Sequence, residues 1–331
     1  MHDYVSQETL MLLMLSNIKG IGEKKLLSLR SITNLKEYSF HDILENILRE
    51  KKENISLLKD KALCYAEDQV AEAKQRGHKI ISVFDKEYPS QLTLSNDSPP
   101  VLFVAGNIDI LNEKAVAVIG TREPTDHGKI ICERLTKWLV ENDWVIVSGL
   151  AKGIDSISHE ACLKFHGKTV AVLAQGLEKI YPQENRILAD NIIKSGGALL
   201  SEYPYKSFTG KSNFVKRDAT QAGLSSSVFL VQTGVNGGSL HASRAILKYG
   251  RPLVVVGQSK TDENKRPDNV EGNLLLLNGN YKDTVNMLGL KFDENLIIKM
   301  KDKDDFTFVN EKIKKHSFFN TQKTQDSFKL L

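Results

Sequence analysis

The chain is poor in cysteine, with three in 331 residues: Cys64, Cys132 and Cys162. No two of them have the short spacing that is typical of metal ligands. The sequence therefore predicts neither a metal site nor a disulfide framework. This sparing use of cysteine is typical of proteins in a reducing cytoplasm, where we expect this one to act.

Long hydrophobic runs are also absent. The apolar run from Leu10 to Leu15 is too short to span a bilayer. It also lacks the basic flank and the small-residue cleavage site of a signal peptide. We therefore expect no interaction with a membrane.

The sequence contains none of the motifs that mark common enzymatic reactions. It has no G-x-G-x-x-G, no Walker A lysine, no nucleophile elbow and no H-E-x-x-H. Neither a Ser/His/Asp set nor a Cys/His set can be assigned from the sequence. We therefore expect a binding protein rather than an enzyme, without a cofactor or a metal.

What the chain does have is an ordinary globular composition and a slight excess of positive charge. Hydrophobic residues make up 41% and charged residues 26%, which is sufficient for a sizeable core. The net charge of +4 is compatible with a polyanionic partner but is far from that of a basic tail.

Residues 6–75 are rich in Leu, Lys and Glu and show no strand-like alternation, which predicts a small helical domain over residues 1–75. Within it, the segment from Ile18 to Lys25 places two glycines in a tight turn between apolar-periodic stretches. This turn is similar to the helix-hairpin-helix (SAM-like) element of DNA-binding proteins. An ordinary turn between helices explains the same residues, so a contact with nucleic acid stays an open alternative here.

From Gly77 onward the pattern changes to strands that alternate with helices. Almost wholly apolar strands separated by helices predict an α/β fold with a doubly wound sheet over residues 76–290. Residues 258–269 read as a polar loop, and residues 291–331 as a docked helix followed by a loose tail, without a winged helix. The expected strands are 79–83, 101–104, 115–120, 144–148, 169–173, 198–201, 228–232 and 252–256, and the expected helices 126–141, 155–166, 184–195 and 240–249.

Five clusters of candidate contact residues follow these strands, where ligands bind in open α/β sheets. The first is Gly120-Thr121-Arg122, in which the glycine permits a tight turn and the arginine offers a fork for phosphate. The second runs from Ser148-Gly149 through Lys152 to Asp155. Capping of a helix is the favoured role for Asp155, and His159 fits a packed histidine better than a base.

The third cluster is Gln175-Gly176, followed by a helix start near Pro182. The fourth, residues 201–217, is the densest mixture of basic and aromatic residues in the chain, and we expect it to form a loop. Basic groups there would follow a nucleic-acid backbone while aromatic rings stack on bases. The fifth, Thr233 to Leu240, is rich in glycine and leads into a helix, which is typical of an anion-binding turn.

Taken in order, these clusters resemble the DNA-processing protein A (DprA/Smf) family over about residues 10–280. The resemblance rests on an ordered series of motifs rather than on any one of them. They are Gly120-Thr121-Arg122, the stretch from Ser148 to His159, Ala171 to Leu177, Tyr181 to Asn185, Leu200 to Pro204, Asn213-Phe214 and Gly238-Ser239-Leu240.

The resemblance implies an extended Rossmann-like fold that binds single-stranded DNA, protects it and helps to load a RecA-type recombinase during transformation. It also implies a homodimer formed through the Rossmann-like domain. The motif positions that line the DNA pocket in the family match Arg122, Lys216 with Arg217, and Gly238 to Leu240. Together with the clusters above, the expected DNA-contact residues are Arg122, Ser148, Gly149, Lys152, Gln175, Gly176, Lys211, Asn213, Phe214, Lys216, Arg217, Gly237, Gly238, Ser239 and Leu240.

The chain departs from the family pattern in the fourth cluster. Where the family continues after Asn-Phe with a basic Arg-Asn-Arg run, this chain has Arg217-Asp218-Ala219. One cation is replaced and one acid is introduced, which should weaken attraction to a phosphate backbone. After Gly238-Ser239-Leu240 the family favours Thr-Ala, and this chain has Ala242-Ser243.

A second hypothesis comes from a different class of protein. The same sheet edge could hold a nucleotide derivative, as in Rossmann-like nucleoside phosphoribohydrolases, with Glu202 as the acid, for example in a defence system. Against it, the pair Gly237-Gly238 is followed by Ser239-Leu240 rather than by the Gly-Thr expected of such hydrolases. Release of a free base would separate this enzyme from a DNA-binding module.

Overall fold

The computed structural model describes residues 4–47, 49 and 54–314. A nine-stranded sheet runs through the molecule in the order β1-β2-β6-β5-β4-β3-β7-β8-β9. Strands β3 to β9 all run parallel to one another. Strand β2 pairs antiparallel with both β1 and β6. The strands are β1 Lys79–Ser82, β2 Val101–Gly106, β3 Ala115–Ile119, β4 Val145–Ser148, β5 Thr169–Leu173, β6 Ala198–Ser201, β7 Val228–Leu230, β8 Leu253–Val256 and β9 Ile297–Met300.

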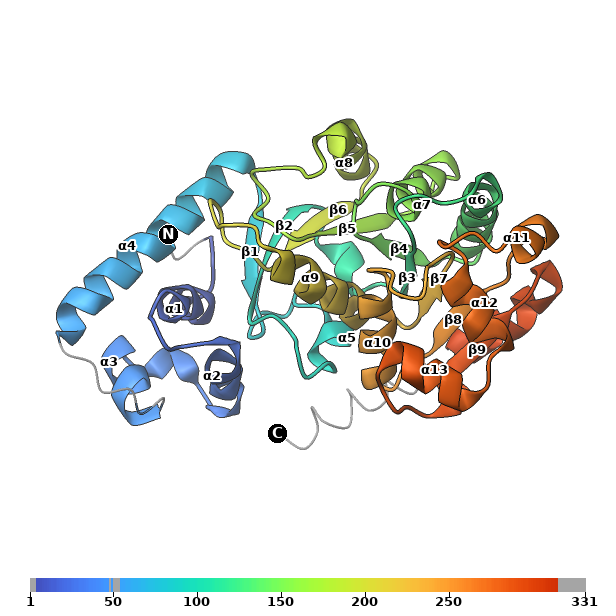
Figure 1. Cartoon of the computed structure of the whole chain (residues 1–331). Coiled ribbons are helices and arrows are strands. Elements are labelled where there is room, and N and C mark those ends of the chain that lie inside the picture. The colour runs from blue at the N-terminus through green and yellow to red at the C-terminus, as the bar shows by residue number, and fades with distance from the viewer. Residues whose placement is uncertain (1–3, 48, 50–53, 315–331) are drawn as a thin grey trace.

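Helices cover both faces of this sheet, as Figure 1 shows, with α6, α7 and α8 on one side and α5, α9, α10 and α13 on the other. The side chains of β3 alternate between the two faces: Val116 and Val118 pack under α6 and α7, while Ala117 and Ile119 face the side of α9 and α10. The helices of this part are α5 Ser90–Thr93, α6 Asp126–Glu141, α7 Ile154–Lys164, α8 Arg186–Lys194, α9 Lys211–Leu224, α10 Leu240–Lys248, α11 Lys260–Lys265, α12 Glu271–Asn278 and α13 Tyr281–Leu288.

The expected doubly wound α/β fold is confirmed, and the predicted strands from 79 to 256 are all present with small shifts of their ends. They were predictable because strands buried on both faces read as continuous apolar runs. Short, wholly apolar segments such as Val-Ala-Val in β3 are typical of strands that are buried in a sheet.

Three expectations about local structure were wrong. The basic stretch expected to be a loop is helical from residue 211. Helix α9 forms there because its C-terminal residues, Thr220 to Leu224, are buried against the sheet. The polar loop after β8 contains the short helix α11. The sheet also continues beyond residue 290, because β9 pairs with β8, whereas the docked helix expected in this region is present over residues 306–314. Residues 315–331 of the expected tail lie outside the described part.

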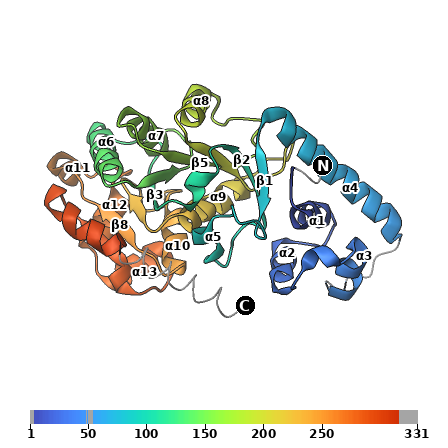
Figure 2. The same cartoon turned by 180° about the vertical axis from the view of Figure 1, so that it is seen from behind.

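The helical N-terminal region is present, with α1 Gln7–Ser16, α2 Glu23–Ser28, α3 Phe40–Asp42 and α4 Ile55–Arg76. It lies at the β1 end of the sheet, which is seen from behind in Figure 2, while β9 lies at the opposite end. The predicted glycine turn lies between α1 and α2, and Gly22 is the N-cap of α2. Helix α4 ends in a left-handed Gly77 (φ +69°) and leads directly into β1.

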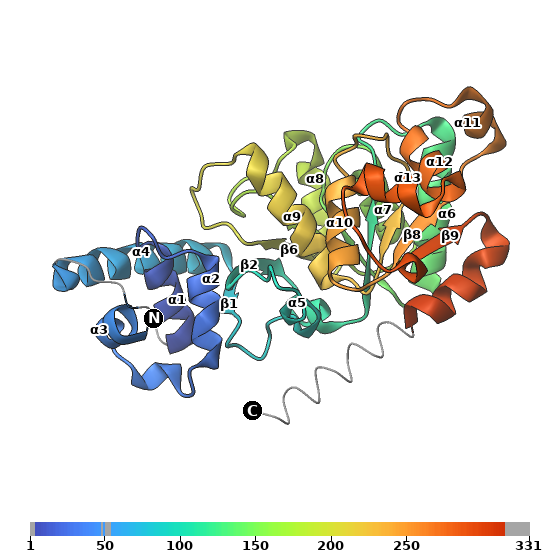
Figure 3. The same ribbon diagram turned by 60° about the horizontal axis from the view of Figure 1, so that its bottom comes forward.

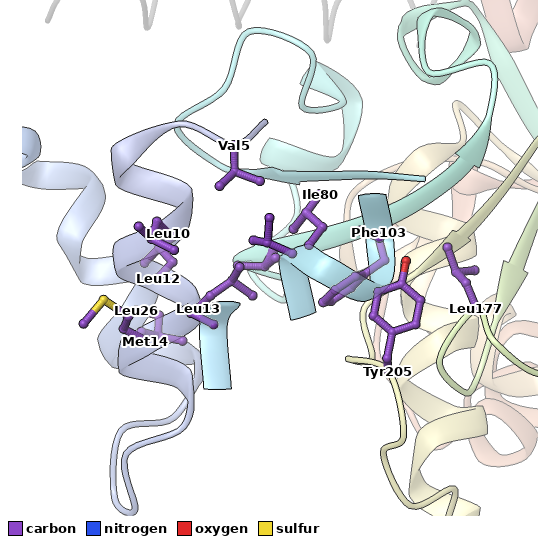
Figure 4. Close-up of a cluster of buried hydrophobic side chains, with 14 of the residues drawn as sticks. Val5, Leu10, Leu12, Leu13, Met14, Leu26, Ile80, Phe103, Leu177 and Tyr205 are labelled. Carbon is purple, nitrogen blue, oxygen red and sulfur yellow. The ribbon is translucent and has the colours of Figure 1, made fainter. Parts of the chain in front are cut away.

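The helical region shares its hydrophobic core with the sheet. Figure 4 shows Leu12 and Leu13 of α1 on one side of this cluster and Ile80, Phe103 and Tyr205 on the other. Tyr205 is buried in this cluster, with only 3% of its surface exposed. The helices and the sheet are therefore packed as one body, which positions α2 next to the residues described below.

Candidate nucleic-acid interface

A cavity of about 580 Å³ lies at the carboxyl ends of β3 and β7. These strands are neighbours, but the chain leaves β3 toward β4 and reaches β7 only after β6. Ligands bind at such a switch point because the loops on its two sides diverge. We call this hollow the rim cavity; its lining includes Arg122, Asp155, Lys211, Phe214, Arg217, Asp218, Gln221, Gly237, Gly238 and Ser239.

A smaller hollow adjoins the rim cavity and shares Arg122, Ala151, Phe214 and Arg217 with it. Its other walls come from the loops after β4 and β5 and from the Tyr-Pro segment before α8. The ends of four parallel strands, β3, β4, β5 and β7, therefore contribute to one continuous rim. The added lining residues are Gly149, Lys152, Ala174, Gln175, Tyr181 and Pro182.

The loop after β3 is held close to the loop after β4, which fixes the position of Arg122. Gly120 has no room for a side chain, because a Cβ would lie 2.6 Å from Ile154 Cγ1 and 2.9 Å from the Gln232 carbonyl oxygen. Gly153 has φ +76° and lies against the backbone of Thr121 and Arg122. The Ile154 amide donates to the Thr121 carbonyl over 3.1 Å.

The loop after β4 carries an unusual backbone. Leu150 is fully buried and has φ +56°, a conformation that non-glycine residues seldom adopt outside constrained sites. The Asn185 side chain donates to the Leu150 carbonyl over 2.8 Å and so holds the loop against the start of α8. A Cβ on the preceding Gly149 would collide with the Arg217 guanidinium, so only glycine fits there.

The glycine-rich loop after β7 presents free backbone donors at the start of α10. The amides of Leu240 and His241 already donate to Gly237 and Gly238, but those of Gly238 and Ser239 make no backbone hydrogen bond among the described residues. The loop is braced by a 2.7 Å hydrogen bond from the Ser239 hydroxyl to Thr233. Free amides at a helix N-terminus attract anions.

Two cations reach the rim cavity without an ion pair among the described residues: Arg122 and Lys211. The Arg122 guanidinium lies 6.0 Å from the centre of the Phe214 ring, and Phe214 meets Tyr181 edge to face at 6.1 Å. Tyr181 is 57% exposed, which is unusual for a large ring that has no other role. Cations beside exposed aromatic faces are the combination that binds an unpaired polynucleotide strand.

Arg217 is different, because it is buried and already committed. Its Nη1 donates to the carbonyl oxygens of Gly149 and Val172, the latter at 3.1 Å. Its Nε lies 3.0 Å from Asp218 Oδ1, an ion pair whose angle falls outside hydrogen-bond geometry. Arg217 thus joins α9 to the ends of β4 and β5, and only part of its guanidinium faces the cavity.

Two carboxyl groups lie at the floor of the rim cavity. Burial raises the pKa of Asp218 to about 6, while the nearby charge of Arg217 acts in the opposite direction. Burial also raises the pKa of Asp155, again opposed by Arg217. A bound phosphate would favour the protonated form of either group, so the floor of the cavity is sensitive to pH.

His159 is a packed histidine, as the sequence favoured, and not an exposed base. Its ring is fully buried, and Nδ1 lies 2.7 Å from the Thr169 hydroxyl. Burial lowers its pKa to about 3, so this histidine is neutral in the fold. Asp155, which we favoured as a cap, lies in the first turn of α7 after Gly153, the N-cap residue.

The structure brings ten of the fifteen predicted contact residues to the two adjoining hollows: Arg122, Gly149, Lys152, Gln175, Lys211, Phe214, Arg217, Gly237, Gly238 and Ser239. Of these, Lys152 is paired with Glu184 at 2.8 Å, so its charge is partly neutralised.

The other five lie outside the lining. Ser148 and Leu240 are fully buried, and the Ser148 hydroxyl donates to the Val118 carbonyl over 2.7 Å. Gly176 packs against Glu178 and Pro204. Asn213 uses its amide to donate to the Ala174 carbonyl over 3.1 Å. Lys216 points away from the rim, toward the N-terminal helices.

Lys216 meets Glu23, the first residue of α2, at 2.6 Å. Beside this pair, Glu202 lines a separate hollow of about 270 Å³ between the sheet and the N-terminal helices, together with Glu23. Burial, and then the charge of Glu23, raise the pKa of Glu202 to about 7. Glu202 is therefore not a lining residue of the rim cavity, where the hydrolase hypothesis requires it.

Sequence reasoning missed Gln221, which the structure places in the lining with 1% of its surface exposed. Its Nε2 has no hydrogen-bond partner, so a buried donor is left at the cavity. Tyr181 was noted only as part of a helix start. Gln221 lies one turn beyond Arg217 on α9, so a helical interpretation of this stretch would have found it.

The described residues contain neither a candidate membrane span nor a candidate metal cluster. No helix in this part of the chain is long and apolar enough to cross a membrane. No group of three or more His, Cys, Asp or Glu side chains among these residues is arranged to hold a metal ion.

The fold and the rim cavity define a Rossmann-like α/β protein whose switch point carries a cavity lined by cations and backbone amides. The family model of DNA recombination-mediator protein A matches residues 79–274, more than half of the chain. The chain therefore belongs to this family.

Individual relatives agree with this assignment. The DNA processing protein DprA of Bacillus subtilis is 39% identical over 194 residues, 58% of this chain and 65% of that protein. The X-ray structure of DprA from Streptococcus pneumoniae has a TM-score of 0.65 at 27% identity and covers 88% of this chain and 99% of its own. DprA from Helicobacter pylori, whose structure is described for its single-stranded DNA binding mode, gives 0.53 at 29% identity over 65% of this chain and 97% of its own.

The matched region is only part of the curated relatives. This chain covers 65%, 46% and 50% of the length of the B. subtilis, Synechocystis and Escherichia coli proteins. What the whole proteins do therefore reaches this chain only as a proposal.

Proposed function

We propose that this protein binds single-stranded DNA along the rim cavity. One observation carries the proposal: Arg122, Lys211 and the free amides of Gly238 and Ser239 converge on one hollow beside exposed aromatic rings. The cations and amides would hold phosphates, while Phe214 and Tyr181 would stack on bases. The unpaired amide of Gln221 would donate to a base or to a phosphate.

The biological role that we propose is that of a recombination mediator. The protein would protect single strands taken up in transformation and help to load a RecA-type recombinase, as a homodimer in the cytoplasm. The relatives support this in that they are described as DNA processing proteins, and one as a single-stranded DNA binder. We propose a binding protein rather than an enzyme, because the rim combines donors and rings without an assigned nucleophile and base.

The test is a binding series with labelled oligo-dT of about fifteen nucleotides, a length suited to one binding surface. We expect unlabelled oligo-dT to compete far better than duplex DNA of the same length. The affinity should also fall steeply with salt, with a slope of about −0.7 for each phosphate contact. A response that is flat with salt, or equal competition by duplex, would contradict the proposal.

The hydrolase hypothesis is less well supported, because Glu202 lies in the hollow at the N-terminal helices and not at the rim. It has its own decisive measurement. Nucleoside monophosphates are incubated with the protein and free base is followed by chromatography. Base release that is abolished by Glu202→Gln would establish the enzyme, and we expect no release from either protein.

A further inference from the structure

A further hollow, which we call the α6 groove, lies apart from the rim cavity. It has a volume of about 710 Å³ and runs between α6 and the segments that follow β8 and β9. Figure 3 shows α6 and β9 at the end of the molecule opposite the N-terminal helices. The groove is lined by His127, Ile130, Ile131, Arg134, Leu135, Lys137, Trp138, Glu141, Val256, Gly257, Gln258, Ser259, Met300, Lys301, Asp302, Lys303 and Phe306.

The floor of the α6 groove is apolar. Trp138 stacks on Phe306 with ring centres 4.3 Å apart, and Ile130 is 47% exposed although it is a large aliphatic residue. Ile130, Arg134 and Trp138 recur every fourth residue, so they form one stripe along α6. The opposite side of α6 is already used, since Cys132 and Leu139 are buried in the core. Ile130 and Trp138 lie on either side of Arg134 in this stripe, and apolar side chains left open on a second face of a helix are typical of a protein contact.

The edge of the α6 groove carries positively charged side chains. Arg134, Lys301 and Lys303 are exposed and form no ion pair among the described residues. Lys137 is paired with Glu141 at 3.6 Å, and the Asp302 side chain is used to cap the turn after β9. The unpaired cations therefore outnumber the unpaired acids around an apolar floor.

One wall of this groove lies outside the family match. The match ends at residue 274, whereas Met300, Lys301, Lys303 and Phe306 follow it in the chain. The helix of residues 306–314 is anchored on α6 and its following turn: Trp144 Nε1 donates to Asn310 over 3.1 Å, and Asn310 donates to Asn142 over 2.9 Å. The groove is thus completed by a segment that lies beyond the residues matched by the family model.

The charge of the groove edge indicates which kind of ligand fits the α6 groove. The remaining C-terminal segment of the chain has Lys315, Lys323 and Lys329 against the single acid Asp326, so its net charge is positive like that of the groove edge. A nucleic acid would match the charge, but the groove offers an apolar floor instead of free backbone amides at a helix start. An acidic segment with a large apolar side chain matches both the positive charge at the edge of the α6 groove and the apolar side chains of its floor.

We propose that the α6 groove docks an acidic peptide segment of a partner protein, with an apolar side chain on the Ile130–Trp138 stripe and carboxylates near Arg134, Lys301 and Lys303. The segment would bind as an anchor in a pocket with a charged surround, the arrangement that gives peptide sites their specificity. This docking does not depend on the proposed DNA binding, because the two hollows share no lining residue.

The experiment selects short random peptides displayed on phage against the full chain, with counter-selection against the double variant Arg134→Glu, Lys303→Glu. We expect the enriched peptides to combine several acids with a Leu, Phe or Trp. A synthetic labelled copy of the best peptide is then titrated by fluorescence polarisation. The double variant should weaken its binding about tenfold or more, and Ile130→Ser severalfold.

The matched control is Lys129→Glu, which reverses an exposed charge on the same helix outside the groove. It should change peptide affinity by less than about twofold, since exposed charges outside a contact contribute little. All four substituted side chains are exposed, and far-UV circular dichroism verifies that each variant is folded.

Three results would overturn the proposal. The selection could enrich no peptide that depends on Arg134 and Lys303, or its consensus could be neutral or basic. Alternatively, oligo-dT could displace the peptide in wild type and in Arg122→Ala alike, which would make the groove a nucleic-acid surface. Peptide binding that survives in Arg122→Ala and resists oligo-dT supports two separate sites.

Discussion

Helix α9 has two functional faces, and they show how position decides the role of a charged side chain. On one face, Lys211, Phe214 and Arg217 line the rim cavity. On the other, Lys216 pairs with Glu23 of α2, and Thr220 donates to Glu202 over 3.3 Å. The sequence presents these residues as one basic cluster, but the helix divides them between the rim cavity and a contact with the N-terminal helices.

The two arginines that line the rim cavity, Arg122 of the loop after β3 and Arg217 of α9, also differ in role. Arg122 lies over an aromatic ring and forms no ion pair among the described residues, so its guanidinium is available to a phosphate. Arg217 is 5% exposed and holds two carbonyl groups and Asp218. The first is suited to bind a ligand and the second to keep the site in shape.

The largest effect that this comparison predicts is on stability. Arg217→Met should lower the free energy of unfolding by about 3 kcal/mol, because it leaves buried carboxyl and carbonyl groups without a partner. Urea unfolding at neutral pH measures it. Arg122→Met is the control and should change the same free energy by less than about 0.5 kcal/mol. Equal stability of the two variants would remove the distinction between the two arginines.

The next largest effect is on DNA affinity. Arg122→Ala should weaken binding of oligo-dT by at least about tenfold, because a charge-assisted contact to phosphate is lost. The salt slope should become shallower by about 0.7, the value for one phosphate contact on a single strand. Fluorescence anisotropy at several salt concentrations measures both. Arg134→Ala, an exposed arginine outside the rim, serves as the control, and an equal loss there would argue against a local site.

A smaller effect concerns the acid at the floor of the rim cavity. The pKa of Asp218 is raised to about 6, so the carboxyl is charged above this pH and repels phosphate. Affinity for oligo-dT should therefore rise as the pH falls through this value. Asp218→Asn should bind several times more tightly at about pH 8 and should lose most of this pH dependence. A pH profile of anisotropy titrations tests this, and identical profiles would exclude Asp218 as the titrating group.

The smallest effect is expected on the other face of α9. Lys216→Ala should change oligo-dT affinity by less than about threefold, because the lysine is paired with Glu23 outside the cavity. Glu23→Ala is the informative partner variant, since it frees Lys216 without removing it. If Lys216→Ala weakened binding as strongly as Arg122→Ala, the DNA path would have to extend across the contact with the N-terminal helices.

The sequence was sufficient for most of the sheet and for the loops that line the rim cavity. Strands such as β3 and β7 are apolar throughout, and the loops after them carry the small and charged residues that mark a ligand edge. It was not sufficient for α9, because the first part of this helix is polar and basic and has no apolar repeat. Its helical state depends on the packing of Ala222 and Leu224 against the sheet.

The individual roles on α9 were also out of reach. Arg217 and Lys216 are adjacent in sequence, so no pattern distinguishes the one that turns inward from the one that meets α2. Gln221 has no charge or motif to attract attention, yet it lines the cavity with an unpaired amide. β9 was missed because Ile297–Met300 is short and follows a polar stretch, and it becomes a strand by pairing with β8.

The amino-acid sequence by itself determined the alternation of strands and helices, the switch-point loops and the family, because apolar periodicity and glycine positions are local properties. The tertiary structure alone decided which cations face a ligand and which are used up within the fold. The reason is that the availability of a charge depends on what lies within a few ångströms of it. Those neighbours, such as Glu23 beside Lys216, come from distant parts of the chain.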